Sequence, residues 1–259
     1  MAFERELQVA LSAAAETGAL SLRYADEGFD VETKPDDSPV TAADKACEQL
    51  IAGILSTEFP DDGLLGEEGA AADGSSGRRW IIDPIDGTRD FIRGNRFWAN
   101  FLALEDAAGP ALGIVSFPAL GELYWAARGK GAWRIVDGRE SRMAVSKVSE
   151  VSKAVACVNG LSEAAFRPFA EKLLPFMSRF SSVRSMGGAL DAMLICCGQA
   201  DFWFESSAKP WDLAPLAIIA RESGARFLSH SGEETIYGGN AVVFTPGLEA
   251  VAREFLELG

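Results

Sequence analysis

Histidine is almost absent from this chain of 259 residues, which contains only His230. Catalytic triads, phosphohistidine enzymes and multi-histidine zinc sites all need imidazole groups at the reacting centre. A lone histidine in the turn-like segment Ser229–Gly232 fits a surface turn better than any of these roles. We therefore expect other side chains to carry the chemistry.

The four cysteines lack the paired short spacing of a zinc site or a redox motif. Cys196 and Cys197 are adjacent in an apolar stretch, which indicates buried thiols. Long hydrophobic runs are missing too, and Glu4, Arg5 and Glu6 stand where a secretory signal would need a basic start and an apolar segment. We expect a cytoplasmic protein with no membrane partner.

Positive charge is scarce, with 24 Lys and Arg against 38 Asp and Glu and a formal net charge of −14. Nucleic-acid binding depends on basic side chains that neutralise phosphates, so we expect no nucleic acid as partner. With 48% hydrophobic residues, the chain can bury a large core as one domain or as two closely packed halves.

The hydrophobic patterns predict an α/β protein, a layered αβαβα sandwich with a different sheet in each half. For residues 1–150 we expect a mainly antiparallel sheet, and for residues 151–259 a smaller mixed sheet. In the first half the expected helices cover residues 3–22 and a segment that starts after the capping box Thr41–Asp44, and the expected strands cover 79–83, 99–105, 111–117, 122–128 and 142–146. In the second half the expected strands lie near 154–158, 180–184 and 202–205, and the expected helices lie near 163–177, 188–198 and 212–223, before two strands and a helix from 247.

Two carboxylates follow an apolar strand in the segment Trp80–Thr88. Pro84 and Gly87 should turn the chain so that Asp83 and Asp86 face one point instead of opposite sides. Two carboxylates directed at one point need a cation between them, and hard oxygen ligands suit Mg²⁺ or Mn²⁺.

Two further acids occupy comparable positions. Glu67 follows the short apolar run Leu64–Leu65, and Asp212 stands at the start of an expected helix, where by itself it would be a capping residue. Together with Asp83 and Asp86 they would form a costly anionic cluster unless metal ions neutralised it. The sequence therefore predicts a metal site.

A rival interpretation is a phosphatase that forms an aspartyl-phosphate, which uses a strand followed by Asp, one residue, Asp, Gly and Thr. In this chain two residues separate Asp83 from Asp86, and this spacing would misplace the second carboxylate as a general acid. Direct attack by a metal-activated water is therefore favoured.

Over almost its whole length the chain resembles the inositol monophosphatase superfamily of Mg²⁺-dependent, lithium-sensitive phosphomonoesterases. The segments that carry the resemblance are Lys34, Thr41–Asp44, Gly66–Glu68, Trp80–Thr88 and Trp211–Ala214. The resemblance implies that Glu67, Asp83 and the backbone carbonyl of Ile85 hold one metal. It also implies that Asp83, Asp86 and Asp212 hold a second, so that Asp83 bridges the pair.

The resemblance further implies catalytic roles. Thr88, paired with Asp44, would orient and help to deprotonate a water held by the metals, with Glu67 and Lys34 as neighbours of that water. Local sequence alone assigns Asp44 to the helix cap, which is compatible with the catalytic role. If a helical turn starts at Gly87, phosphate oxygens would meet the backbone N–H groups there.

Substrate choice is expected from residues around the leaving group. The residues expected to contact the ester are Asp86, Gly87, Thr88, Arg184, Gly187, Gly188, Asp191, Glu205 and Asp212. Segments 90–99, 117–121 and 209–212 look more like the histidinol-phosphatase branch of the family than like animal inositol monophosphatases. Histidinol phosphate carries an ammonium and an imidazole, which acids such as Glu205 and Asp191 would attract. The chain departs from that branch at Gly188, where the branch often has an acid.

We therefore predict an enzyme that uses Mg²⁺, with Mn²⁺ as a substitute, to hydrolyse a small-molecule phosphate ester. Histidinol phosphate, from histidine biosynthesis, is the first candidate, and inositol 1-phosphate is the second. Sugar bisphosphates and 3′-phosphonucleotides fit the same chemistry, and a metal-binding regulatory protein without turnover is the alternative of a different class. The resemblance implies a homodimer. Residues 1–150 should carry most metal ligands, and residues 151–259 should add Asp212 and the substrate contacts.

Overall fold

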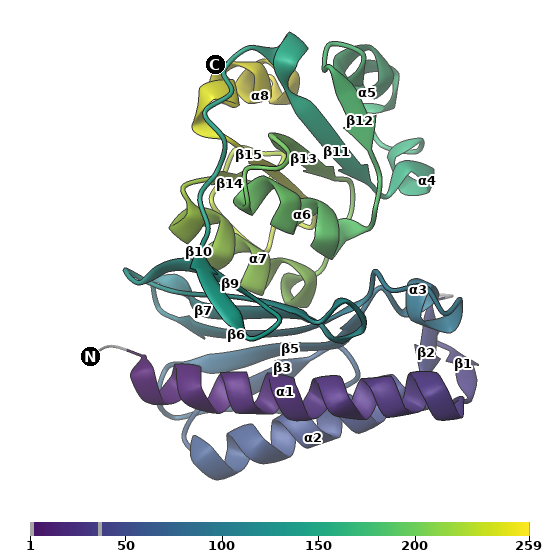
Figure 1. Cartoon of the computed structure of the whole chain (residues 1–259), viewed down its shortest axis with the longest axis vertical. Helices are drawn as coiled ribbons and strands as arrows, with labels where there is room; N and C mark the ends of the chain where they lie inside the picture. The colour runs from purple at the N-terminus through teal and green to yellow at the C-terminus, as the bar shows by residue number, and fades with distance from the viewer. Residues whose placement is uncertain (1–2, 36–37, 259) are drawn as a thin grey trace.

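The computed structural model describes residues 3–35 and 38–258, which form layers in the order helix, sheet, helix, sheet, helix (Figure 1). The helices are α1 (Glu4–Glu27), α2 (Ala42–Glu58), α3 (Thr88–Ile92), α4 (Leu161–Ala164), α5 (Ala170–Met177), α6 (Gly188–Cys196), α7 (Pro210–Ser223) and α8 (Glu249–Leu256). Helices α1 and α2 cover the outer face of one sheet, α6 and α7 lie between the sheets, and α4, α5 and α8 pack on the outer face of the other. The predicted αβαβα sandwich is confirmed.

The large sheet has eight strands in the order β10-β9-β8-β7-β6-β5-β3-β4. Its strands are β3 (Gly63–Gly66), β4 (Ala71–Ala72), β5 (Arg79–Asp86), β6 (Ala99–Asp106), β7 (Gly109–Phe117), β8 (Glu122–Ala127), β9 (Gly131–Val136) and β10 (Arg139–Arg142). Every neighbouring pair is antiparallel except β3 and β5, as predicted for the first half. A separate antiparallel pair, β1 (Val31–Thr33) and β2 (Pro39–Thr41), lies next to α3.

The small sheet has five strands in the order β12-β11-β13-β15-β14 and is mixed, as predicted. Its strands are β11 (Val155–Asn159), β12 (Ser182–Arg184), β13 (Phe202–Glu205), β14 (Arg226–Leu228) and β15 (Ala241–Phe244). Strands β11, β12 and β13 are parallel to one another, so the carboxyl ends of β11 and β13 lie side by side. Helix α7 packs against the large sheet on one side and α6 on the other.

Two predicted elements are wrong. The strand expected at 142–146 does not form, because only Arg142 belongs to a strand, as the last residue of β10, and residues 143–146 have no regular secondary structure. Strand β10 pairs with β9 in a hairpin whose turn residues Asp137 and Gly138 both have positive φ (50° and 72°), as a tight hairpin turn requires. The helix expected over 163–177 is divided into α4 and α5, with Pro168 in the interruption. Proline has no N–H to donate within a helix, so it favours a break there.

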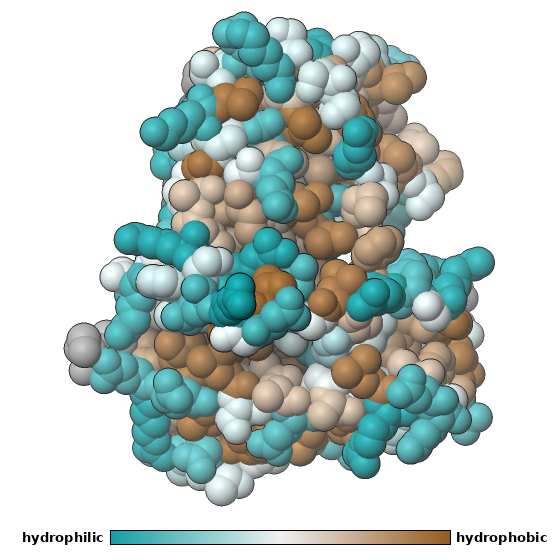
Figure 2. Space-filling view, viewed as in Figure 1, coloured by the Kyte–Doolittle hydropathy of each residue, from teal (hydrophilic) through white to brown (hydrophobic). Residues whose placement is uncertain are grey.

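The cores follow the layers. Trp80 and Ile82 of β5 face α1 and α2, whereas Trp203 of β13 faces the central helices. The aromatic residues Trp98, Phe202, Trp203 and Phe204 are all buried, as core residues rather than surface ones. The face of the molecule seen in Figure 2 mixes hydrophilic side chains with smaller hydrophobic patches and is notched beside α3. Within 3–35 and 38–258, no helix combines the length and the apolar character needed to cross a bilayer.

Candidate functional site

Asp83 and Asp86 lie near the end of β5, on either side of a β-bulge. Asp83 pairs with Phe101 of β6 and Asp86 with Ala99, so β5 has one extra residue between its two acids. In a regular strand residues three apart point to opposite faces, and the extra residue restores a common side. Asn100 holds the bulge by donating a hydrogen bond to the Pro84 carbonyl at 2.6 Å. The bulge, rather than a turn that leaves the sheet, directs the two carboxylates to one point.

Carboxylate oxygens of Asp83, Asp86 and Asp212 lie within 4.8 Å of one another. Asp83 is 2% exposed, and its Oδ1 has no hydrogen-bond partner among the described residues. Burial, followed by repulsion from neighbouring acids, raises the pKa values of Asp83 and Asp86 well above the usual range. Burial likewise raises the pKa of Asp212 to about 7. Crowded carboxylate oxygens, one of them buried without a hydrogen-bond partner, suit a hard divalent cation, so these residues fit a metal site.

Asp212 reaches this cluster from the first turn of α7. Its Oδ2 also accepts the backbone N–H of Lys209 at 2.7 Å, the contact of a residue that caps a helix. Asp212 therefore both caps α7 and belongs to the acidic cluster.

Glu67 follows β3 and is tied to β5 by its backbone N–H, which donates to the Ile82 carbonyl at 3.1 Å. Its carboxylate accepts Lys34 Nζ at 2.9 Å, and the same ammonium donates to Glu68 at 2.6 Å. Burial acts to lower the pKa of Lys34, but the hydrogen bonds to both glutamates outweigh it and the pKa is raised. Lys34 is therefore a permanent cation that holds Glu67 beside the acidic cluster.

Thr88 and Asp44 form the predicted pair. The Thr88 hydroxyl lies 3.2 Å from Asp44 Oδ1 and 3.2 Å from the Ile85 carbonyl oxygen, and it can donate to either. The other oxygen of Asp44 accepts the backbone N–H of Thr41 at 2.8 Å in the predicted capping box. Asp44 is fully buried, and burial raises its pKa. One carboxylate thus fixes both the start of α2 and the hydroxyl of Thr88.

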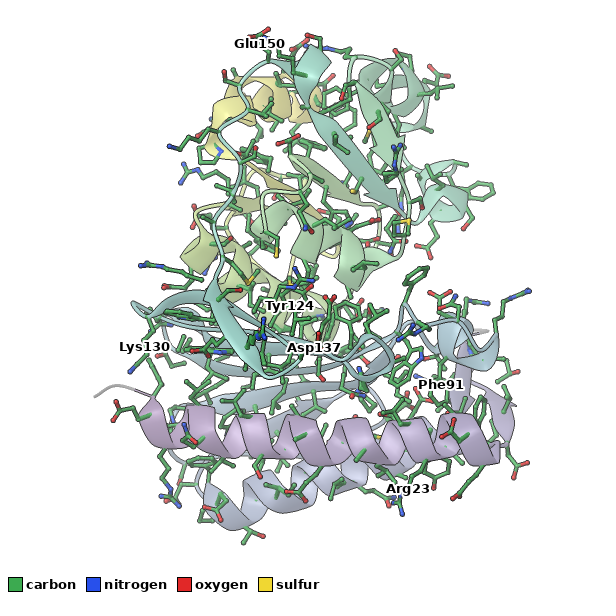
Figure 3. The ribbon with its side chains drawn as sticks, viewed as in Figure 1. Arg23, Phe91, Tyr124, Lys130, Asp137 and Glu150 are labelled. Carbon is green, nitrogen blue, oxygen red and sulfur yellow. The ribbon has the colours of Figure 1, made fainter. Side chains whose placement is uncertain are left out.

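The turn that carries Thr88 is held by the backbone conformation of the residue before it and by aromatic packing of the helix after it. Gly87 has φ of 83°, a left-handed conformation that glycine adopts readily, and α3 begins at the next residue. Phe91, labelled in Figure 3, anchors α3 by stacking on Phe29 at 4.7 Å and meeting Trp98 edge-on at 5.0 Å. The helical turn expected after Gly87 is therefore present.

A cavity of about 60 Å³ adjoins the acidic cluster. Asp86 and Asp212 line one part of it, and Asn159, Gly188 and Glu205 line another. Glu205 is 4% exposed, and burial raises the pKa of its carboxyl to about 8. The structure therefore places Gly188 and Glu205, two of the residues expected to contact substrate, next to the acids.

Other residues expected near the ester lie outside this cavity lining. Arg184 is exposed and donates to the Val183 carbonyl at 2.9 Å. Asp191 is fully buried and accepts the Met186 N–H at 3.2 Å, so it holds the loop that leads into α6. Gly187 supplies a φ of 116° at that entry, a conformation that favours glycine.

His230 lies in a turn, as expected, but its ring packs against aromatic side chains instead of lying free on the surface. Its ring stacks on Phe204 at 4.7 Å and meets Phe169 edge-on at 5.1 Å. Burial lowers its pKa to about 4, so the imidazole is neutral near pH 7. It packs within the small-sheet half and is not part of the acidic cluster.

Sequence reasoning missed two supporting residues. Glu48 is buried and accepts the backbone N–H groups of Glu68 at 2.8 Å and Ala70 at 2.7 Å, which holds the turn that presents Glu67. It lies four residues after Asp44 on the same helix, so helical periodicity could have indicated it. Asn159 ends β11 as a polar residue after an apolar strand, the same signal that identified the acids.

Comparison with known proteins defines the class. Residues 3–257 match the model of the inositol monophosphatase family, and the chain belongs to this family. It is thus a phosphatase of the phosphoric monoester hydrolase class.

Particular relatives narrow the comparison. The chain is 41% identical to histidinol-phosphatase of Mycobacterium tuberculosis over 232 residues, which cover 89% of this chain and 86% of that one. It is 31% identical to inositol-1-monophosphatase of Mesorhizobium japonicum over 262 residues, which cover 99% and 97%. A solved structure of an IMPase from Thermotoga maritima superimposes with a TM-score of 0.84 at 28% identity, covering 98% of this chain and 99% of that chain.

Proposed function

We propose that this phosphatase hydrolyses a small phosphate monoester with divalent cations held by its acidic cluster. The observation that carries the proposal is the approach of Asp83, Asp86 and Asp212 within 4.8 Å, with one buried oxygen of Asp83 left without a partner in the described chain. Glu67 and the Ile85 carbonyl are proposed to complete the ligands. Mg²⁺ is the proposed ion and Mn²⁺ its substitute, because every ligand is a hard oxygen.

Cations bound there would acidify a water and screen the charge that develops on the leaving oxygen. The protein's own groups would do the positioning. Thr88 Oγ1, held by Asp44, would orient the attacking water, and the Asp44 carboxylate would receive its proton through the threonine hydroxyl. Lys34 would hold the Glu67 carboxylate toward the same centre through their ion pair. The backbone N–H groups of Gly87 and Thr88 are the proposed donors to phosphate.

L-Histidinol phosphate is the proposed substrate. The 41% identity to a protein named histidinol-phosphatase supports this choice. Glu205 supports it physically, because it lines the cavity beside the acids, and an ammonium or imidazolium of the alcohol half would offset the effect of burial by favouring the ionised form of its carboxyl. Inositol 1-phosphate is the second candidate, favoured by the relative that matches 99% of the chain.

A phosphate-release assay tests the proposal. The purified protein is offered L-histidinol phosphate, myo-inositol 1-phosphate, fructose 1,6-bisphosphate and 3′-phosphoadenosine 5′-phosphate, each with Mg²⁺ and with EDTA. We expect release from histidinol phosphate that EDTA abolishes and Mg²⁺ restores. Release that persists in EDTA would contradict the metal mechanism, and preference for another ester would contradict the substrate. Lithium sensitivity, the homodimer, the cytoplasmic location and the division at residue 150 stay predictions.

A further inference from the structure

The carboxyl ends of β11 and β13 are tied together by two side-chain hydrogen bonds beside the cavity. Asn159 and Glu205 are directly paired in the parallel register, and Asn159 Nδ2 donates to Glu205 Oε2 at 2.7 Å. One residue further on, Ser206 Oγ donates to the Gly160 carbonyl at 2.8 Å. Only the first of these bonds acts on the glutamate carboxylate.

Glu205 depends on Asn159 for its orientation. Its second oxygen, Oε1, accepts the backbone N–H of Ser207 at 3.5 Å, which is at the limit of a hydrogen bond. The short bond from Asn159 leaves this oxygen able to accept a stronger donor. The Asn159 amide does not titrate, so its ability to donate to Glu205 does not change with pH.

The lack of a side chain at Gly188 leaves room for the hydrogen-bonded side chains of Asn159 and Glu205. A Cβ at position 188 would lie 3.0 Å from Asn159 Nδ2 and 3.2 Å from Glu205 Oε2. Gly188 starts α6 without a positive φ, so backbone conformation does not require glycine there. Glycine is needed at position 188 because a larger residue would crowd the side chains of both Asn159 and Glu205.

We propose that Asn159 is a positioning residue for substrate selectivity, which acts by holding Glu205 so that Oε1 can accept a hydrogen-bond donor from the alcohol half of the ester. Gly188 supports it by leaving the pair undisturbed. The inference rests on the proposed phosphomonoesterase function and extends it to the class of alcohol that is accepted. That class carries an ammonium, an imidazole N–H or a hydroxyl at the end remote from the phosphate.

The test compares Asn159→Ala with Ser206→Ala on two esters. L-Histidinol phosphate offers donors to Glu205, whereas p-nitrophenyl phosphate offers none. For Asn159→Ala we expect the KM of histidinol phosphate to rise about tenfold while kcat stays within about twofold, because one hydrogen bond between Glu205 and the alcohol half is lost from binding. Kinetics on p-nitrophenyl phosphate should stay within about twofold of wild type. Gly188→Ala should shift the same KM in the same direction.

Ser206→Ala is the matched control, because it removes the neighbouring tie between the strands and leaves the carboxylate bond intact. It should leave the preference between the two esters unchanged. A similar loss of preference in Ser206→Ala, or an equal loss on both esters in Asn159→Ala, would show that the strand ends are merely loosened and would overturn the proposal.

A crystal structure of Asn159→Ala separates this inference from the proposed function. We expect the Glu205 carboxylate to leave its wild-type orientation or to occupy more than one. An unchanged carboxylate would overturn the positioning role. This readout stands even if the wild-type protein hydrolyses neither ester, a result that would reject the proposed function alone.

Discussion

The two sheets contribute different groups to the site. The large sheet supplies the groups proposed for chemistry: Asp83 and Asp86 across the bulge of β5, Glu67 after β3, and Thr88 in the turn beyond β5. The small sheet supplies Glu205 and Asn159 from the ends of parallel strands. The layer of helices between them adds Asp212 and Gly188.

The two regions therefore separate the groups proposed to bind metal and activate water from those proposed to meet the leaving group. The groups from the large sheet are crowded acids, and backbone hydrogen bonds between β5 and its neighbours hold them in place. The second set lines a cavity of about 60 Å³ and contains one buried acid, held by one amide. Changes in the second region can therefore alter the preferred ester without changing the chemistry.

The largest effect is expected from Asp83→Asn, which removes the proposed bridging ligand at the centre of the large-sheet set. Turnover of every ester should fall by at least about 10³-fold, because the loss affects a step common to all substrates. Titration calorimetry should show weaker Mg²⁺ binding. Asp73→Asn, at an exposed position after β4, is the control and should behave as wild type. Selective loss on one ester would contradict the assignment.

Thr88→Val should give the next largest effect. It removes the hydroxyl that bonds to Asp44 and keeps the shape of the side chain, so kcat should fall about 10²-fold on every ester. Mg²⁺ affinity should change little, since neither proposed ligand set includes the hydroxyl. Thr57→Val removes a hydroxyl that only bonds within α2 and serves as the control. A loss of metal affinity equal to the loss of kcat would place Thr88 among the ligands instead.

Glu205→Gln tests the small-sheet region. The substitution keeps the size of the side chain and removes the acid that a cationic alcohol half would hold in its ionised form, so kcat/KM for histidinol phosphate should fall about tenfold relative to p-nitrophenyl phosphate. Steady-state kinetics on both esters measures this ratio. An equal fall of kcat/KM on both esters would contradict the proposal that the small-sheet region acts on substrate selectivity and not on the chemical step.

The same contrast explains what the sequence could predict. Asp83, Asp86 and Thr88 lie within one short segment, so local pattern was enough to associate them, although the bulge that aligns the acids depends on pairing with Phe101 and Ala99. The role of Asn159 depends on the register of β11 with β13, which strand patterns do not specify.

Local rules failed where tertiary packing decided. His230 lies in a turn-like segment, yet its ring fills a space between Phe204 and Phe169 that only the folded small-sheet half creates. The interruption between α4 and α5 was predictable in principle, because Pro168 was visible in the sequence.

The smallest expected effect concerns the pH dependence of the stability of the metal-free protein, to which the acidic cluster should contribute. Burial raises the folded-state pKa of Asp212 to about 7, and burial with neighbouring acids raises those of Asp83 and Asp86, whereas unfolded aspartates titrate near pH 4. The stability gained by keeping these groups protonated is fully present below pH 4 and is lost as pH rises through the folded-state values.

Mg²⁺ bound at the proposed site would replace those protons, so its stabilising effect should grow as the pH rises. Thermal unfolding at pH 5, 6.5 and 8, with Mg²⁺ or EDTA, should show a Mg²⁺-dependent increase in Tm of about 1 °C at pH 5 and about 5 °C at pH 8. In Asp83→Asn the increase at pH 8 should shrink, whereas Glu205→Gln should retain most of it, because Glu205 is not a proposed ligand. A Tm increase that is the same at all three pH values would contradict the cation's proposed place among these carboxylates and with it the division of labour between the sheets.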